Sequence, residues 1–80
     1  MDDKNMNIIF GSFIKQGRER RGLDQQVVAD GVGLSQSHYS RIENGTRGCY
    51  FQVAIKICDF LKLDINDFQR MIKESKSPQP

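Results

Sequence analysis

The sequence GLSQSHYSRIENG at residues 33–45 decides how this chain folds. Ser35 is a preferred helix N-cap, and the closing Asn-Gly pair suits the left-handed cap that ends a helix. A short helix is therefore expected over Gln36–Glu43. Tyr39 and Ile42 stand three residues apart and form its inner face. The polar residues between them lie off that face and are available to a partner.

A second short helix is expected immediately before this one. It begins after Asp24, a good N-cap, and extends from Gln25 to about Gly31. Gly31 and Gly33 bracket Val32 in a turn that only small residues permit. Two helices of about seven residues, joined by a glycine turn, are typical of a helix-turn-helix.

Helical periodicity predicts three further helices, and strand signals are absent, so the fold class is all-α. The helices are expected over Ile8–Arg21, Phe51–Leu61 and Ile65–Lys73. Gly17, in the middle of the first, costs about 1 kcal/mol relative to alanine and marks a close helix contact. The inner stripe of the fourth helix is expected to be Phe51, Ala54, Ile55, Cys58 and Leu61. One domain would span residues 8–73, between a flexible N-terminus at 1–7 and a disordered tail at 74–80.

Length and composition exclude several classes of protein. A chain of 80 residues, 38% of them hydrophobic, allows one domain with one small core. It leaves no room for a deep catalytic cleft, and no acid–base or nucleophile constellation is present, so no enzyme is expected. Two cysteines and one histidine at scattered spacing predict no disulfide framework, metal site or cofactor.

The location expected from the sequence is the cytoplasm. No apolar run is long enough to span a membrane, and the acidic start MDDKNMN does not resemble a signal peptide. A reducing cytosol would keep both cysteines as thiols. Cys58 is expected to be a small buried hydrophobe, and a redox role for Cys49 is not favoured because only Arg47 flanks it.

The distribution of charge indicates where an anionic partner would bind. Residues 32–56 carry Arg41, Arg47 and Lys56 against Glu43 alone. Residues 58–67 carry three aspartates against Lys62. The positive middle of the chain is therefore the part that an anion such as DNA would meet.

Together these stretches resemble the phage-repressor (lambda repressor-like, Cro/XRE-type) helix-turn-helix family. The matching segments are RERRGLDQ at 18–25, VA at 28–29, GLSQSHYSRIENG at 33–45 and KICDFL at 56–61. The resemblance implies a compact five-helix DNA-binding domain. Its second and third helices form the helix-turn-helix, and the third enters the major groove of double-stranded DNA.

The polar residues divide by role under this resemblance. Glutamine pairs well with adenine and arginine with guanine in the major groove. The residues expected to contact bases are Gln36, Ser37 and Arg41, with His38 and Ser40 contacting bases or phosphates. The residues expected to contact phosphates are Gln25, Asn44, Thr46 and Arg47. Arg18 and Glu43 match a family pair that forms an internal salt bridge.

A monomer with so few phosphate contacts would bind DNA weakly at physiological salt. We therefore expect a homodimer that reads an inverted repeat. The dimer candidates are leftover apolar residues around the fifth helix: Phe60, Ile65, Phe68, Met71 and Ile72. The expected function is transcriptional repression by a stand-alone bacterial, phage or plasmid regulator, or by a restriction–modification controller protein, bound to DNA in the nucleoid. Whether it contacts RNA polymerase is left open.

An alternative is an antitoxin-like module whose main partner is a toxin or another protein. The evidence for it is a second apolar stripe of Val53, Ile57 and Phe60, which a partner surface would explain. Phe13 lies off the main stripe of the first helix. The sequence leaves open whether Phe13 covers the N-terminal segment or joins a partner surface.

Overall fold

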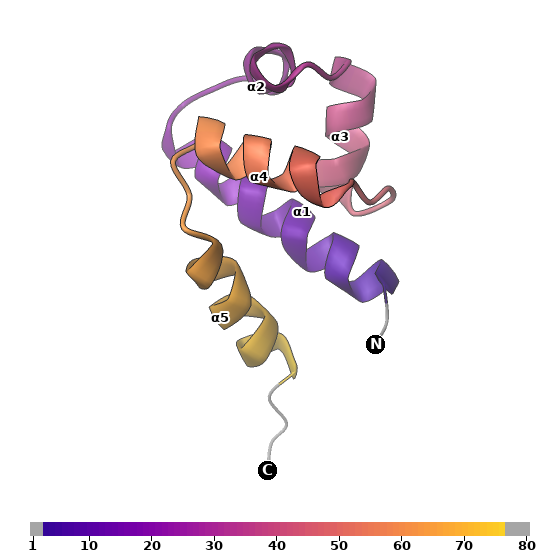
Figure 1. Ribbon diagram of the computed structural model, residues 1–80, viewed down its shortest axis with the longest axis vertical. Helices are drawn as coiled ribbons and strands as arrows, with labels where there is room; N and C mark the ends of the chain where they lie inside the picture. The colour runs from indigo at the N-terminus through magenta and orange to yellow at the C-terminus, as the bar shows by residue number, and fades with distance from the viewer. Residues whose placement is uncertain (1–2, 77–80) are drawn as a thin grey trace.

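The computed structural model describes residues 3–76, which fold into five helices (Figure 1). In chain order these are α1 (Asp3–Arg20), α2 (Gln25–Val32), α3 (Gln36–Asn44), α4 (Phe51–Phe60) and α5 (Ile65–Lys76). No strand occurs among residues 3–76. The all-α, five-helix architecture predicted from the sequence is therefore confirmed.

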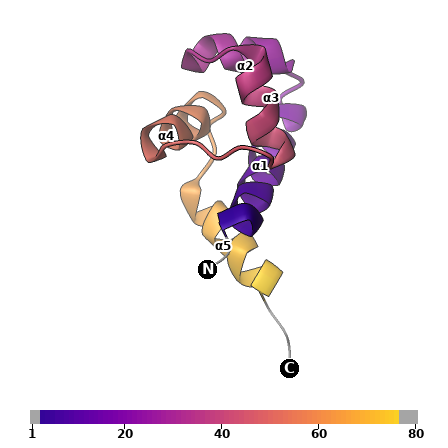
Figure 2. The ribbon, with the colours of Figure 1, turned by 90° about the vertical axis from the view of Figure 1, so that its right-hand side faces the viewer.

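Helix α1 is the longest helix and connects the two ends of the molecule. It packs against α3 and against α5, whereas α2 packs against α3 and α4. Figures 1 and 2 show α2 and α3 together at one end of the molecule and α5 at the other. The proposed helix-turn-helix and the last helix therefore occupy separate regions. Within residues 3–76 no helix is long and apolar enough to cross a membrane.

The outer limits of the first and last helices differ from the predicted ones. α1 begins at Asp3 instead of Ile8, so residues 3–7 are helical where a flexible segment was expected. Met6 and Asn7 are half-buried there, and both line a pocket with the loop after α3, which gives the added turn something to pack on. α5 continues to Lys76, so residues 74–76 of the predicted disordered tail are helical. Residues 1–2 and 77–80 lie outside the described part.

The turn between α2 and α3 begins at Gly33, whereas Gly31 and Val32, which were predicted to belong to the turn, lie in α2. Gly33 takes the left-handed conformation with φ 79° and ends α2. The Leu34 N–H then donates to the Ala29 carbonyl at 2.9 Å. Ser35 caps α3 because its hydroxyl oxygen accepts from the His38 N–H at 3.1 Å. Asp24 has the extended backbone of an N-cap but makes no side-chain cap hydrogen bond, so its expected capping role is not observed.

The core is built from side chains of α1 to α4 and the residue that follows α4. Its largest fully buried members are Ile14, Val28, Tyr39, Ile42, Ile57 and Leu61. Phe13, whose place the sequence left open, is buried, and its ring centroid lies 5.6 Å from that of Phe68. Phe68 also meets Phe10 edge-on at 5.3 Å. These aromatic contacts attach α5 to α1.

The predicted inner stripe of α4 is confirmed in part, because Cys58 and Leu61 are buried and Ala54 packs against the core. Ile57 is fully buried beside Cys58 and Leu61, whereas Phe51 and Ile55, both expected inside, are 75% and 42% exposed. The remaining members of the supposed second stripe, Val53 and Phe60, are half-buried and pack against the core. The prediction of an exposed partner stripe at Val53, Ile57 and Phe60 is therefore wrong. Packing of α2 against α4 turns that face inward.

Two glycines of α1 permit close approaches. A Cβ at Gly17 would stand 2.7 Å from a methyl of Leu63, so the predicted close contact exists, although its partner lies in the α4–α5 connection and not in a helix. A Cβ at Gly11 would collide with the backbone carbonyl of Glu43. Only glycine at position 11 lets α1 and α3 pack this closely.

Candidate nucleic-acid interface

Helix α3 is anchored by its apolar face and presents its polar face outward. Tyr39 and Ile42 are buried in the core. Among the side chains that do not enter the core, those of Gln36, Ser37 and Arg41 are exposed, and those of His38 and Ser40 are half-buried. The orientation predicted for this helix, with Gln36 and Arg41 outside, is confirmed.

The loop after α3 extends this polar surface. Gly45 is left-handed with φ 78°, and the Thr46 N–H and hydroxyl both donate to the Arg41 carbonyl, at 3.1 and 3.3 Å. These bonds close the end of α3 and hold the loop to it. Asn44, Thr46 and Arg47 are all exposed.

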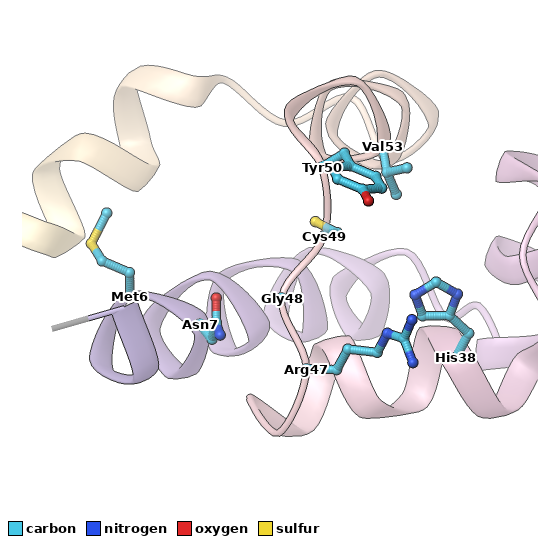
Figure 3. Close-up of a pocket in the computed structure, with 8 residues that line it drawn as sticks. All are labelled: Met6, Asn7, His38, Arg47, Gly48, Cys49, Tyr50 and Val53. Carbon is cyan, nitrogen blue, oxygen red and sulfur yellow. The ribbon is translucent and has the colours of Figure 1, made fainter.

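A pocket of about 580 Å³ opens beside α3, between the loop and the start of α4. In Figure 3 the Arg47 guanidinium lies beside the His38 ring, and Tyr50 lies next to Val53 on the other side. Cys49 and Gly48 form the stretch between them. The pocket thus has a polar, cationic side next to α3 and an apolar side on α4.

The surface of α3 and its loop is positive. Residues 35–50 contain two arginines, Arg41 and Arg47, and both are exposed. The one carboxylate in that stretch, Glu43, is only 5% exposed and is ion-paired. An approaching phosphate backbone would therefore meet cations and no exposed acid here.

A buried polar network lies beneath α3 and ties it to α1 and α2. Arg18 holds Glu43 through two bonds, Nε to Oε2 at 2.6 Å and Nη2 to Oε1 at 3.1 Å, which forms the salt bridge that the family resemblance implied. Arg18 Nη1 also donates to the Leu23 carbonyl at 2.8 Å. Gln25 Nε2 donates to Glu43 Oε1 at 2.9 Å. The network thus joins one residue from each of α1, α2 and α3 and holds α3 in place.

The network also determines the protonation of its members. Burial raises the pKa of Glu43, but hydrogen bonds from Arg18 and Gln25 outweigh it and hold that pKa below its usual range. Burial and the neighbouring Glu43 carboxylate raise the pKa of Tyr39, whose hydroxyl is buried without a well-formed hydrogen bond. Glu43 therefore remains a carboxylate and Tyr39 remains neutral at pH 7.

Comparison with known proteins identifies the fold and family. A family model described as a helix-turn-helix domain matches residues 9–71. The chain belongs to this helix-turn-helix family. The predicted XRE-like helix-turn-helix family is therefore confirmed, and membership points to a DNA-binding protein rather than a catalyst.

Two solved structures share the helix-turn-helix fold of this chain. Both are crystal structures of the clp gene regulator ClgR from Corynebacterium glutamicum, each with a TM-score of 0.81. One is 18% identical over 92% of this chain and 96% of that chain. The other is 17% identical over 88% of this chain and 74% of that chain. At identities this low, the structural likeness shows a shared fold. A search of the curated proteins found no match to the sequence.

Gln25 occupies a different position from the one its predicted role suggests. It is half-buried, and its side-chain amide donates to Glu43 in the network beneath the helix-turn-helix. A side-chain amide has two N–H donors. The second donor is the one left for a phosphate, so the predicted contact stays a prediction.

The five dimer candidates do not form one surface. Ile65, Phe68 and Ile72 line a common groove, whereas Phe60 lies on the α2 side of α4 beside Gly31. Met71 lies on another side of α5, in a hollow with Phe13. Phe60, Phe68 and Met71 are half-buried and pack against the core, and the dimer role expected of the five residues stays a prediction.

Sequence reasoning missed two features near the helix-turn-helix. Arg21, directly after α1, donates from Nε to the Leu61 carbonyl at 2.7 Å and ties the ends of α1 and α4 together. Tyr50 and Phe51 are 82% and 75% exposed. The only local signal for the second feature is that two aromatics stand side by side, so that both cannot face one core.

Neither of the two thiols is activated by its surroundings. Burial raises the pKa of the Cys49 and Cys58 thiols, and Cys58 is buried as predicted. A raised thiol pKa disfavours a reactive thiolate. Among the side chains that the structure describes, no group of three or more His, Cys, Asp or Glu could hold a metal ion.

Proposed function

We propose that this protein is a sequence-specific transcriptional regulator that inserts α3 into the major groove of double-stranded DNA. The observation that carries the proposal is the outward projection of Gln36, Ser37 and Arg41 from a helix anchored by buried Tyr39 and Ile42. The major groove is about 12 Å wide and admits one α-helix. The exposed arginines beside that helix supply the attraction to phosphate.

The base contacts are assigned by exposure along α3. Arg41 reaches guanine through a bidentate pair, Gln36 reaches adenine, and Ser37 reaches either. His38 and Ser40 are half-buried at the edges of the same face and contact bases or phosphates from there.

The phosphate contacts come from the two borders of the helix-turn-helix. Arg47, Thr46 and Asn44 lie on the loop after α3, and Gln25 opens α2. Such contacts position the protein on the duplex and carry no sequence information themselves. Arg47 contributes the charge among them.

The regulatory mode that fits is repression by a homodimer bound to an inverted repeat. Two copies would place their recognition helices in successive major grooves about 34 Å apart and would occlude a promoter. The likeness to ClgR, a clp gene regulator by name, supports a role in gene regulation. This mode of action fits phage and plasmid regulators and restriction–modification controllers. If the protein activates transcription, RNA polymerase would be a further partner. The antitoxin-like alternative rested on the Val53, Ile57 and Phe60 stripe, and burial of Ile57 leaves it without support.

Selection of bound duplexes from a random-sequence library tests this function. The expected result is a defined half-site, repeated in inverted orientation. Arg41→Ala should weaken binding to the selected duplex by about 1–3 kcal/mol and relax the preference at one base position. Arg70→Ala is the matched control because it removes an exposed arginine from α5, away from α3. Selection without a motif, or equal losses in the two variants, would contradict the proposal.

A further inference from the structure

The pocket beside α3 has a size and a lining that the proposed base contacts do not explain. Its volume of about 580 Å³ lies within the range of small-molecule sites, roughly 300–1,000 Å³. Such sites combine an apolar lining with a few polar groups that orient the ligand. The pocket therefore has room for a ligand of its own.

The side of the pocket next to α3 is cationic. Figure 3 shows the Arg47 guanidinium beside the His38 ring. In the part of the chain that the structure describes, Arg18 and Arg21 donate hydrogen bonds to protein oxygens, whereas Arg47 donates none. A guanidinium fork binds an acid group through two parallel hydrogen bonds. Arg47 therefore has its donors available for an anion in this pocket.

Nothing in the described lining opposes a negative charge there. None of the residues 3–76 that line the pocket is acidic. Burial raises the pKa of the Cys49 thiol, so this group stays neutral at pH 7 and adds no charge. A Cβ at Gly48 would lie 2.9 Å from Asn7 Oδ1, so the loop lies directly against α1 at this point. The surroundings favour a single anionic group next to Arg47.

The side of the pocket next to α4 is apolar. The Tyr50 ring lies next to Val53 in Figure 3, and Met6 lines the same pocket from α1. Val53 packs against the core, whereas Tyr50 is 82% exposed. An exposed aromatic ring gains its burial only when something covers it. A flat apolar body could cover Tyr50 while its acid group reaches Arg47.

We propose that this pocket binds a small monoanion with an apolar body, such as an aromatic carboxylate, and that this ligand competes with DNA for Arg47. The acid group would lie against Arg47 and His38, and the apolar body against Tyr50 and Val53. The competition rests on the proposed function, in which Arg47 contacts a DNA phosphate. One guanidinium cannot give the same donors to both, so each would weaken the binding of the other.

A bare phosphate would use only part of the pocket. It would meet Arg47 and His38 and leave the apolar side next to α4 uncovered. An amphipathic ligand covers both sides, which is why the lining favours it over a phosphate group alone.

A second recess shares part of this lining. The groove between α1, α4 and α5 also includes Arg47, Gly48 and Cys49, but it is lined by Phe51 in place of Tyr50. Tyr50 and Phe51 are similarly exposed, at 82% and 75%. Substitution of these two neighbouring aromatics therefore distinguishes a ligand in the pocket from one in the groove.

Fluorescence titration of the full chain with two dyes tests the site without DNA. Anilinonaphthalene sulfonate carries one sulfonate on an apolar ring system, and phenylnaphthylamine has the same rings without the charge. The sulfonate dye should bind with a dissociation constant of about 10–100 µM, as expected for a ligand of this size. Arg47→Gln should weaken the sulfonate dye at least about tenfold and the neutral dye less than about twofold, because it removes only the partner of the charge.

Two matched controls accompany these variants. Tyr50→Ser should weaken both dyes at least about threefold, since both use its ring. Phe51→Ser removes a similarly exposed ring from the groove and not from the pocket, and should change neither. Arg70→Gln removes an exposed arginine from α5 and should leave the sulfonate dye bound as in the wild type. Thermal melting confirms that each variant is folded.

Three results would overturn the proposal. The first is an equal loss of the sulfonate dye in Arg47→Gln and Arg70→Gln. The second is a loss in Phe51→Ser and not in Tyr50→Ser, which would place the dye in the groove. The third concerns displacement: 1-naphthoate should displace the sulfonate dye, and inorganic phosphate at the same concentration should not. Equal displacement by phosphate would show a phosphate site that the DNA backbone fills.

Binding to selected duplexes separates this inference from the proposed function. The sulfonate dye at about ten times its dissociation constant should weaken binding to the selected duplex about tenfold. Unchanged duplex affinity would overturn the competition. If no duplex is selected while the dye results hold, the function fails and the ligand site stands. If a duplex is selected and neither Arg47→Gln nor Tyr50→Ser weakens the dye, the ligand site fails and the function stands.

Discussion

Helices α3 and α4 have nearly the same length, nine and ten residues, but they are held in place by different forces. α3 has a side-chain cap at Ser35, a left-handed glycine at its end, and the buried Arg18–Glu43 pair beneath it. α4 has no side-chain cap hydrogen bond, and the left-handed residue after its end is a lysine, Lys62, instead of a glycine. It is held by Ile57, Cys58 and Leu61 packing into the core. α3 therefore combines its buried Tyr39 and Ile42 with directional bonds, whereas α4 depends mainly on apolar contact area.

This difference suits two different tasks. A helix that reads base edges must hold its side chains in one orientation, and the bonds from Arg18 of α1 and Gln25 of α2 to Glu43 provide that. The apolar wall of a ligand pocket needs only exposed apolar area, which Tyr50 provides at the start of α4. Substitutions in the two regions should therefore differ in size and in the property they change.

The largest effect is expected when the network beneath α3 loses its carboxylate. Glu43→Ala leaves the Arg18 guanidinium, whose side chain is 13% exposed, without its partner, and it removes an acceptor from Gln25. Stranding a buried charge costs about 3–5 kcal/mol of unfolding free energy. Urea denaturation measures the loss.

Asp67→Ala is the matched control for Glu43→Ala. It breaks the ion pair between Asp67 and Arg70 in α5. The side chain of Arg70 is 66% exposed and that of Asp67 is 51% exposed. An exposed pair contributes at most about 1 kcal/mol. Equal losses in the two variants would show that the network beneath α3 does not act as a buried unit.

The next effect tests which face of α4 is inside. Ile57→Ala should destabilise the fold by about 2–5 kcal/mol because it opens a cavity in the core. Ile55→Ala, two residues earlier and 42% exposed, makes the same chemical change and should cost well under half of that. Thermal or urea unfolding of both variants measures the two losses. If the face predicted from the sequence were the buried one, Ile55→Ala would lose more stability than Ile57→Ala.

The contrast between the two helices explains how far the sequence could predict the structure. The ends of α3, its buried Tyr39 and Ile42 and its exposed Arg41 follow from caps and spacing within thirteen consecutive residues. The inward face of α4 depends on where α2 packs, and the apolar residues of α4 lie on more than one face. Phe51, Ile55 and Ile57 are all large and apolar, so periodicity alone could not choose between the stripes.

The candidate site divides in the same way. The outward side chains of α3 could be predicted because they are what remains after its apolar face is assigned. The hydrogen bonds of Gln25 to Glu43 and of Arg21 to Leu61 join residues 18 and 40 positions apart, which no local pattern reveals. The groove beside Phe51 needs three helices to form, so it became visible only in the fold.

The smallest effect concerns the end of α4 and has the opposite sign. α2 and α3 end in left-handed glycines, Gly33 and Gly45, whereas the left-handed residue after α4 is Lys62, with φ 58°. Its N–H donates to the Asp59 carbonyl at 3.2 Å, and the Leu63 N–H donates to Cys58 at 2.8 Å, so this position serves as a helix cap. A side chain held in the left-handed region costs roughly 1 kcal/mol, which glycine avoids.

Lys62→Gly should therefore stabilise the fold by roughly 0.5 kcal/mol, part of the gain being offset by the greater freedom of glycine in the unfolded chain. Lys73→Gly makes the same change within α5 and should destabilise by about 1 kcal/mol. Opposite shifts in the urea midpoint would show that α4 lacks the glycine cap that α2 and α3 possess. A loss of stability in Lys62→Gly would mean that the lysine side chain stabilises this turn by more than its backbone strain costs.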